Sequence, residues 1–494
     1  MRYYSTRNKH LTLSAGQAMI QGLAEDGGLF LPETLSVSLP DIDYAGVSYQ
    51  ELAEIILKPF LTDYTAEEIR RCAALAYDNK YSTAEIAPLR KIRDGWLLEL
   101  WHGPTSAFKD LALTIMPHFL TAAYEHAGST DTICILTATS GDTGKAALAG
   151  FADVPNTSVT VFFPENGVSP LQKRQMQTSI GSNVSVIAVR GNFDDCQRMV
   201  KECSSDPAVR CAGRHVTLSS ANSINIGRLL PQIVYYYAAY ASLVKHGEIT
   251  AGQEVTFCVP TGNFGDILAG YMAGQTGLPV RHLVCASNAN NVLTDFFRTG
   301  SYSVHRPFHM TMSPSMDILV SSNLERLLFL ASGGNDVLVS DCMEKLKKEG
   351  EYTISPDLLD TLQKTFIAYD AQEDDCRNEI AGLYGSEHVL IDPHTAAGMH
   401  AMHAYQQEYR TSVPCVVLST ASPFKFPGSV LSCLGMDAPE NEFAALRMLS
   451  GMSGMAVPEN IAALEHLPVR FRTVIDPDEG REYIVQILEE LSHD

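Results

Sequence analysis

Short apolar runs that end in glycine-rich turns recur between residues 96 and 425. A run of four to eight apolar residues bounded by turn residues is typical of a buried strand, and the chain contains WLLEL (96–100), TICILTAT (132–139), VTVFF (159–163), VSVIAV (184–189), VTFCVP (255–260) and VPCVVLST (413–420). Several of these runs lead through a turn into a segment with apolar residues at helical spacing, such as residues 111–127. Strands that alternate with helices predict an α/β fold with open, mostly parallel sheets covered by helices. Ligands bind such sheets beyond the carboxyl ends of the strands, where the glycine-rich turns lie.

The two ends of the chain differ from this middle part. Residues 1–95 contain TLSAGQAMIQGLAEDGGLFLP and then an acidic, mainly helical stretch, which predicts a separate N-terminal module. After residue 426 the strand pattern fades, and MSGMAVPENIAALEHL predicts terminal helices that pack on the main body. We therefore predict three parts, 1–95, 96–425 and 426–494, with a smaller lobe at about 130–230 in the middle part.

Composition narrows the class of protein. The 494 residues are 45% hydrophobic and 19% charged, which is typical of a globular chain, and the formal net charge of -21 argues against nucleic acid as a partner. The most apolar stretch, 233–244, is too short to span a membrane, so we expect a cytoplasmic protein without a membrane partner. The eleven cysteines form no CxxC pair, which predicts free buried thiols rather than a zinc site.

The stretch HGPTSAFKD (102–110) places Lys109 after a turn, beside Phe108 and at the start of an apolar helix. Most lysines are solvated surface residues, and that is the simpler interpretation. The alternative is a lysine that holds an aldehyde cofactor. An apolar setting favours the uncharged amine that such chemistry requires.

Two glycine-rich turns lie between a predicted strand and a predicted helix. In TGNFGD (261–266) the amides converge at a helix N-terminus and form a candidate phosphate site, with a structural turn as the alternative. SGDTGK (140–145) is not a Walker A motif, because Thr139 and Ala146 occupy its required Gly and Ser or Thr positions. It remains a candidate carboxylate site or a structural turn.

Three further segments carry candidate chemistry. SSANSINIGR (219–228) ends in Arg228, which can clamp a phosphate with help from Ser223 and Asn222, or can simply follow a capped helix start. Lys173 lies in a basic spot, SPLQKRQM, that is more often a solvated helix face. His400 and His403 lack a third metal ligand, so we interpret them as packing residues and predict no metal site.

Taken in order, the motifs HGPTSAFKD, TATSGDTGKAA, FFPENGVSPLQKRQM, NSINIGR, PTGNFGD, DPHTAAG and LSTASPFKF resemble those of the threonine synthase family, in its bacterial and fungal form. MRYYSTRN and AEDGGLFLP also resemble the N-terminal module of that form. The resemblance runs from residue 1 to about residue 435. It implies the architecture of fold-type II enzymes that depend on pyridoxal 5'-phosphate.

The resemblance also implies roles for individual residues. Lys109 would carry the cofactor as a Schiff base. The cofactor phosphate and its surroundings would be held by Thr261, Gly262, Asn263, Phe264, Gly265 and Asp266. Thr420 would face the pyridine nitrogen, and Asn225 is a candidate for the ring 3-hydroxyl. The substrate carboxylate would be held by Ser140, Gly141, Asp142 and Thr143, and the substrate phosphate by Asn222, Ser223, Arg228 and Lys173. Many fold-type II relatives have Asn where Asp142 stands.

The implied activity is conversion of O-phospho-L-homoserine and water to L-threonine and phosphate, by γ-elimination and β-addition of water. Two alternatives stay open at this point. One is a threonine or serine dehydratase type of lyase, which needs no second phosphate site. The other is a non-catalytic binding protein that keeps the fold. We expect a small-molecule substrate and a monomer or homodimer.

Overall fold

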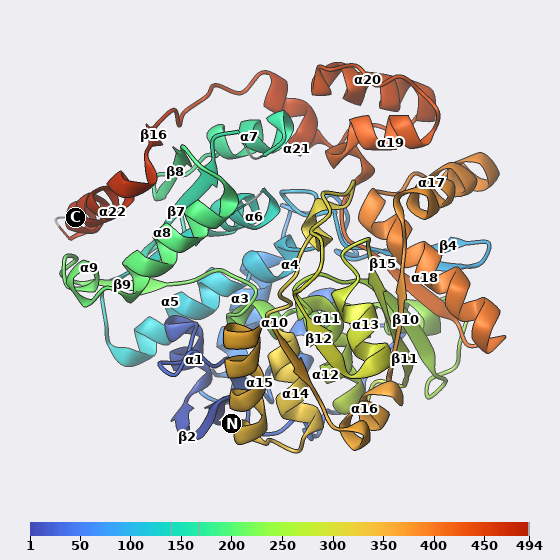
Figure 1. Ribbon diagram of the computed structural model, residues 1–494, viewed down its shortest axis with the longest axis horizontal. Helices are drawn as coiled ribbons and strands as arrows, with labels where there is room; N and C mark the ends of the chain where they lie inside the picture. The colour runs from blue at the N-terminus through green and yellow to red at the C-terminus, as the bar shows by residue number, and fades with distance from the viewer. Residues whose placement is uncertain (140, 167, 493–494) are drawn as a thin grey trace.

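The computed structural model describes residues 1–139, 141–166 and 168–492, which form two main sheets with their helices (Figure 1). The larger sheet has six strands in the order β14 (Phe366–Asp370), β11 (Val280–Ser287), β10 (Val255–Pro260), β15 (Cys415–Ser419), β5 (Gly95–Glu99) and β4 (Leu89–Ile92). Its strands are parallel except at the edge, where β4 runs antiparallel to β5. The predicted α/β class with open, mostly parallel sheets is confirmed.

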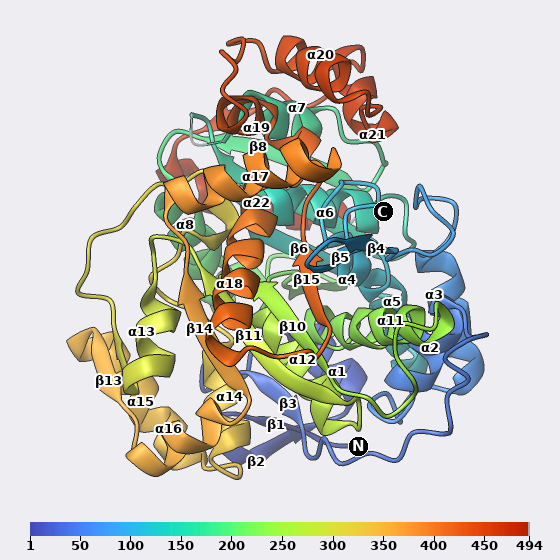
Figure 2. The ribbon, with the colours of Figure 1, turned by 90° about the vertical axis from the view of Figure 1, so that its right-hand side faces the viewer.

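The direction of the chain crossovers decides which helices cover each face of this sheet. The connection from β10 to β11 moves one way across the sheet, and the connection from β14 to β15 moves the other way. Because such crossovers are right-handed, their helices lie on opposite faces. Accordingly, α12 (Gly265–Gln275) and α13 (Val292–Thr299) cover one face, and α18 (Pro393–Tyr409) covers the other (Figure 2).

The smaller sheet has five parallel strands in the order β16 (Val474–Ile475), β8 (Val184–Val189), β7 (Thr157–Pro164), β6 (Thr132–Ala138) and β9 (Val216–Ser219). Its covering helices are α6 (Asp142–Phe151), α7 (Pro170–Gln177), α8 (Phe193–Ser205) and α9 (Pro207–Arg210). The edge strand β16 comes from the C-terminal segment, for which the sequence pattern predicts helices alone. Two residues are too few to produce a strand period, so this strand exists only through its pairing with β8.

The helix expected over 111–127 is divided into α4 (Asp110–Leu113) and α5 (Met116–Ala127). Pro117 has no N–H to donate to the carbonyl of Leu113, so the helical ladder is interrupted there. Lys109 is the residue before α4 rather than a residue of its first turn. The interruption therefore leaves Lys109 at the head of a single helical turn.

The N-terminal segment forms a three-stranded antiparallel sheet and three helices, which are β1 (Tyr3–Ser5), β2 (Asn8–Leu13), β3 (Phe30–Pro32), α1 (Ala15–Gln21), α2 (Tyr49–Leu57) and α3 (Ala66–Ala76). It packs on α5 and on the buried helix α11 (Gln232–Lys245). Between residues 226 and 387 the remaining elements are α10 (Ile226–Leu229), α14 (Leu324–Ala331), α15 (Asp336–Glu349), α16 (Pro356–Gln363), α17 (Glu373–Glu387), β12 (Ser301–Ser303) and β13 (Glu351–Thr353).

The C-terminal segment crosses the top of the molecule in Figure 1, from the side of the larger sheet to that of the smaller. Its helices are α19 (Pro427–Cys433), α20 (Glu442–Ser453), α21 (Glu459–Ala462) and α22 (Gly480–Leu491). Ile484 and Leu488 of α22 are buried in the same apolar cluster as Cys134 and Phe162 of the smaller sheet. Within the described ranges, the structure contains no helix of the length and apolarity needed to traverse a bilayer.

Candidate active site

Lys109 lies in a turn that buried groups hold from two sides. The amide and hydroxyl of Thr105 donate to the carboxylate of Asp110 at 2.8 and 2.6 Å, which closes the turn. The amide of Phe108 donates to the carbonyl of Thr420 at 2.8 Å and joins the turn to the end of β15. The side chain of Lys109 is 13% exposed, and its Nζ lies 4.7 Å from the centre of the Phe108 ring. Burial lowers the pKa of Lys109 to about 8, although the charge of Asp142 acts in the opposite direction.

The TGNFGD segment forms the predicted turn between β10 and α12. Gly262 packs so closely that a Cβ there would lie 2.8 Å from the carbonyl oxygen of Ser315. Phe264 has a positive φ of 62° and directs its side chain into the core, where it stacks on Phe297. Among the described residues, the amides of Asn263 and Phe264 have no hydrogen-bond acceptor. These free amides next to the N-terminus of α12 suit an anion.

Asp266 lies in the first turn of α12 and is buried. Its Oδ1 accepts hydrogen bonds from the hydroxyls of Tyr235 at 2.6 Å and Tyr236 at 2.9 Å. Its Oδ2 is buried and has no partner within the described part of the chain. Burial raises the pKa of Asp266 to about 6, against the effect of the two tyrosine hydrogen bonds. The carboxyl therefore changes its ionisation near pH 6, and among the described residues its Oδ2 stays without a partner.

Asp142 lies at the N-terminus of α6, with its Oδ2 3.9 Å from the Nζ of Lys109. Burial opposes its ionisation, but the ammonium groups of Lys425 and Lys109 outweigh burial and lower the pKa of Asp142. Gly141 has a φ of 147°, and its amide donates to the hydroxyl of Thr139 at 3.0 Å. Thr143 is half-buried beside them, and Ser140 lies outside the described residues.

Arg228 is 3% exposed and lies in the short helix α10. Its Nη1 donates to the carbonyl of Ala221 at 2.6 Å, and its Nε is buried without a partner among the described residues. Burial lowers the pKa of Arg228 to about 10, and its charge in turn lowers the pKa of Lys109. Asn222 and Ser223 are half-buried in the preceding loop. A buried guanidinium with an unpaired N–H lowers the stability of the fold unless an anion binds to it.

Thr420 is 7% exposed, and within the described part of the chain its hydroxyl has no hydrogen-bond partner. A buried network lies behind it, consisting of Ser419, Thr395, Asp392, His394 and the amide of Ser315. His394 Nδ1 lies 2.7 Å from Asp392, and its Nε2 accepts from the amide of Ser315 at 3.1 Å. The network thus connects the end of β15 with the segment that packs on Gly262.

Two predicted residues stand apart from this group. Asn225 is fully buried and donates from Nδ2 to the carbonyls of Met19 and Ser220 at 2.8 Å each, while its Oδ1 caps α10. These bonds weigh against a role at the cofactor ring, which stays a prediction. Lys173 lies on α7 and donates to the carbonyl of Glu165 at 3.1 Å.

Sequence reasoning missed Arg326, a fully buried residue of α14. Its guanidinium donates to Asn323 Oδ1, to the carbonyl of Ile224 at 2.6 Å and to that of Phe30 at 3.0 Å. Asn323 in turn donates twice to the carbonyl of Asn263. One side chain therefore ties both candidate anion loops to the N-terminal module. No local pattern signals it, because two of its three partners, Ile224 and Phe30, are 102 and 296 residues away in sequence.

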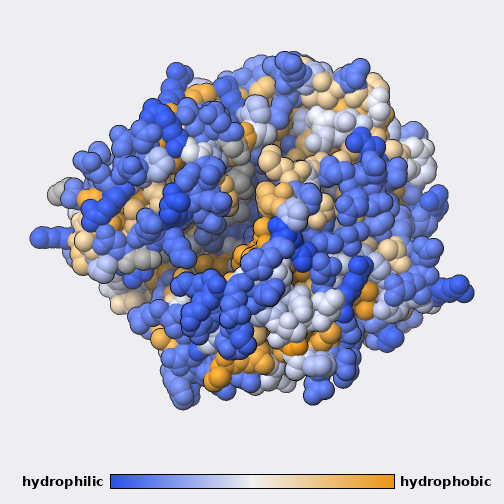
Figure 3. Space-filling view, in the orientation of Figure 1, coloured by the Kyte–Doolittle hydropathy of each residue, from blue (hydrophilic) through white to orange (hydrophobic). Residues whose placement is uncertain are grey.

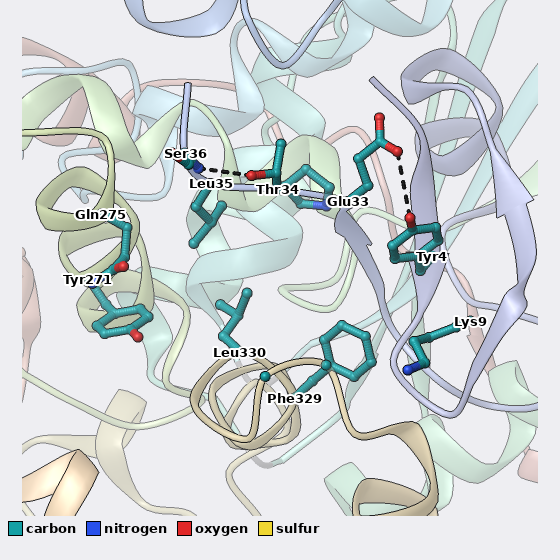
Figure 4. Close-up of a pocket in the computed structure, with 13 residues that line it drawn as sticks. Tyr4, Lys9, Glu33, Thr34, Leu35, Ser36, Tyr271, Gln275, Phe329 and Leu330 are labelled. Atoms are coloured by element: carbon teal, nitrogen blue, oxygen red, sulfur yellow. Dashed lines mark hydrogen bonds between the residues drawn. The ribbon is translucent and has the colours of Figure 1, made fainter. Parts of the chain in front are cut away.

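Figure 3 shows the surface hollowed between the side that carries α6 and α8 and the side that carries α13. α4 and α6, which follow Lys109 and Gly141, lie at this boundary in Figure 1. A separate cavity of about 320 Å³ lies between the N-terminal module and the C-terminal ends of α12 and α14, lined by Tyr4, Glu33, Tyr271, Gln275, Phe329 and Leu330 among others (Figure 4). None of the predicted site residues lines that cavity.

Comparison with known proteins decides the family. Models of a pyridoxal-phosphate dependent enzyme, of a threonine synthase N terminus and of a threonine synthase C-terminal region match residues 85–420, 2–77 and 395–484. Threonine synthase of Pseudomonas aeruginosa is 40% identical over 87% of this chain and 90% of its own length. The chain belongs to the threonine synthase family.

Two further similar proteins support this assignment. The crystal structure of pyridoxal-phosphate-bound threonine synthase from Brucella melitensis has a TM-score of 0.87 and 35% identity, with both chains fully covered. Threonine synthase-like 1 of Homo sapiens is 38% identical over 91% of this chain, which spans 62% of that protein. The predicted family, fold type and cofactor, pyridoxal phosphate, are therefore confirmed.

The residues of the site fit the cofactor that the threonine synthase family uses. Lys109 supplies a shielded amine, and the close packing at Gly262 leaves room for backbone amides, rather than a side chain, to face an anion. The hydroxyl of Thr420, unpaired within the described ranges, can meet a ring nitrogen. Within the described residues, no group of three His, Cys, Asp or Glu side chains is placed to hold a metal ion. His403 instead pairs with Glu379 at 2.9 Å.

Uptake of pyridoxal phosphate by the cofactor-free protein is expected to become faster as the pH rises through about 8. Only the uncharged amine attacks an aldehyde, and a pKa of about 8 makes Lys109 mainly ammonium below that pH and mainly amine above it. The rate of the absorbance change on mixing, measured from about pH 6.5 to 9.5, gives the inflection. A rate that still rises steeply at the upper end of this range, as an ordinary lysine pKa of about 10.4 would produce, would contradict the buried setting of this amine.

Proposed function

We propose that the chain converts O-phospho-L-homoserine and water to L-threonine and phosphate. The observation that carries this proposal is the buried Nε of Arg228, which has no partner among the described residues, on a guanidinium close enough to Lys109 to lower the pKa of that lysine. It supplies an anion site in addition to the one in the turn before α12. A cofactor phosphate occupies one such site, so the second suits a substrate that carries its own phosphate.

Each part of the site has a task in this reaction. The loop around Gly141 and Thr143 holds the substrate carboxylate at the N-terminus of α6, and the turn at Asn263 to Gly265 holds the cofactor phosphate. Arg228, with Asn222 and Ser223, holds the phosphate that leaves the γ carbon. When bound, pyridoxal phosphate supplies an electron sink that stabilises a carbanion next to the substrate nitrogen.

Lys109 moves the protons. Its Nζ, uncharged when free, would accept the proton of the substrate α carbon, give that proton up to the bound cofactor, and only then accept a proton of the β carbon, after which phosphate leaves the γ carbon. Water then adds at the β carbon to give L-threonine. Thr420 offers the ring nitrogen a hydroxyl instead of a carboxylate, which keeps that nitrogen largely unprotonated and limits side reactions.

The test is incubation of the purified holoenzyme with O-phospho-L-homoserine while phosphate and threonine are both measured. Equal amounts of the two are expected. Phosphate without threonine would contradict the proposal, and so would activity only toward L-serine or L-threonine, which indicates a dehydratase. A colourless protein that borohydride does not change would indicate a non-catalytic binding protein. A cytoplasmic location and a monomeric or homodimeric state stay predictions.

A further inference from the structure

Lys425 is one of the most deeply buried charged residues of the site, at 3% exposure, and the proposed function gives it no task. It follows β15, in a segment that ends in SPFKF. Its Nζ donates to Asp142 Oδ1 and to the carbonyl of Thr105, the latter at 3.3 Å. Lys425 and Asp142 are 283 residues apart in sequence. A buried ion pair of this kind costs desolvation, so its presence calls for a physical reason.

Asp142 poses an electrostatic problem for the proposed substrate. Its carboxylate lies at the N-terminus of α6, in the loop that is proposed to hold the carboxylate of the substrate. Two carboxylates that share a site oppose each other's ionisation and binding. An amide side chain at this position would avoid the conflict. An acid there requires a compensating cation.

We propose that Lys425 is a positioning residue whose ammonium cancels the charge of Asp142, so that the pair acts toward the substrate carboxylate as a neutral side chain would. This inference rests on the proposed function, because it concerns the same carboxylate site. It predicts that Lys425 is needed only as long as residue 142 is an acid.

The geometry assigns this task to Lys425 rather than to another lysine. Lys145 is also buried, but its Nζ donates to the carbonyl of Thr105 at 3.0 Å, and within the described residues it makes no hydrogen bond to Asp142. Lys109 approaches the other carboxylate oxygen, Oδ2, at 3.9 Å. Lys425 therefore engages one oxygen of Asp142 and leaves the second directed at Lys109.

The pair also acts on Lys109. The charged groups that face this amine are Asp142 and Asp110, which raise its pKa, and Lys425 and Arg228, which lower it together with burial. Removal of Lys425 alone would leave Asp142 free to stabilise the ammonium form of Lys109. Removal of both partners would largely restore the balance.

The experiment is a double-variant cycle on the holoenzyme with the variants Lys425→Met, Asp142→Asn and the two combined. Lys425→Met is expected to raise the KM for O-phospho-L-homoserine on the order of thirtyfold or more, because it leaves a buried carboxylate unpaired. The combined variant is expected to return to within about threefold of the parent. Lys145→Met is the matched control. The charge of Lys145 also favours the ionised form of Asp142, but its Nζ donates to the carbonyl of Thr105, so adding Asp142→Asn should bring much less recovery than in Lys425→Met.

Two measurements besides turnover test the same inference. Equilibrium binding of L-threonine should weaken in Lys425→Met and recover in the combined variant, whereas binding of inorganic phosphate should change by less than about threefold. The inflection pH of cofactor uptake should rise in Lys425→Met, fall in Asp142→Asn and lie near the parent value in the combined variant. A lysine that only supports the fold would produce neither pattern.

The inference is overturned if the combined variant is as impaired as Lys425→Met, or if Asp142→Asn improves Lys145→Met equally. If Lys425→Met does not fold, Asp142→Asn is compared with the combined variant instead. A combined variant that loses more than about tenfold in substrate affinity relative to Asp142→Asn would also overturn the inference. Lys425→Arg, which keeps the charge, should retain most of the affinity. A failure of the proposed function would appear separately, as a parent enzyme that forms no threonine.

Discussion

Replacement of Lys109 by alanine is expected to lower the rate of threonine formation by more than about a thousandfold, because the proposed general base and the covalent anchor of the cofactor are lost together. Its setting supports this expectation. The side chain is 13% exposed, with a pKa lowered by burial to about 8, so a large share of the amine is uncharged under mildly alkaline conditions.

The measurement is simultaneous release of phosphate and threonine, with borohydride reduction of the bound cofactor as a second readout. Lys109→Ala should show no cofactor that reduction fixes to the protein. Lys58→Ala is a suitable control, because Lys58 is also partly buried and donates to the carbonyl of Tyr64, within the N-terminal module. A Lys109→Ala variant that retains a tenth or so of the parent rate would contradict the role assigned to this amine.

Replacement of Arg228 by methionine is expected to raise the KM for O-phospho-L-homoserine by roughly thirtyfold to a thousandfold, because a buried charge-assisted contact with the substrate phosphate is lost. The affinity for pyridoxal phosphate should change by less than about threefold, since the cofactor phosphate is proposed to lie at the turn before α12. This split between substrate and cofactor separates a threonine synthase from a dehydratase type of lyase.

Steady-state kinetics and cofactor titration of the same preparations provide the check. Arg228→Lys keeps a positive charge but lacks the planar fork, so it should lie between the parent and Arg228→Met. Arg228→Met also removes the hydrogen bond to the carbonyl of Ala221, and thermal unfolding controls for that loss. Equal losses of substrate and cofactor affinity would show that Arg228 supports the loop as a whole and does not bind the substrate phosphate.

Sequence reasoning succeeded where structure depends on neighbours along the chain. The six predicted strands are present as β5, β6, β7, β8, β10 and β15, and TGNFGD follows the end of β10 as expected. A run of apolar residues predicts a buried strand, and glycine predicts a turn, so both elements can be predicted from the local sequence. The division of the helix at 114–115 shows the limit of this reasoning, because its apolar period continues across the break that Pro117 imposes.

The candidate site was only partly accessible in this way. We expected four charged residues near ligands: Lys109, Asp142, Asp266 and Arg228. In the structure the charges of the other three interact with that of Lys109, so the four lie close to one another. Asn225 was expected there as well, yet its amide is occupied by carbonyls of the N-terminal helix region and its own loop. Whether an amide side chain faces a ligand or the backbone depends on segments that its local sequence does not contain.

The sequence by itself determined the fold class, the order of strands and turns, and through its ordered motifs the resemblance to the threonine synthase family. The tertiary structure alone decided which groups meet the buried charges: Asp142 meets Lys425, and the carbonyls of Ile224 and Phe30 meet Arg326. The physical reason is that strand and turn preferences arise within a few residues. The partners of a buried charge depend on how two sheets and an N-terminal module pack together, and no local sequence pattern predicts this packing.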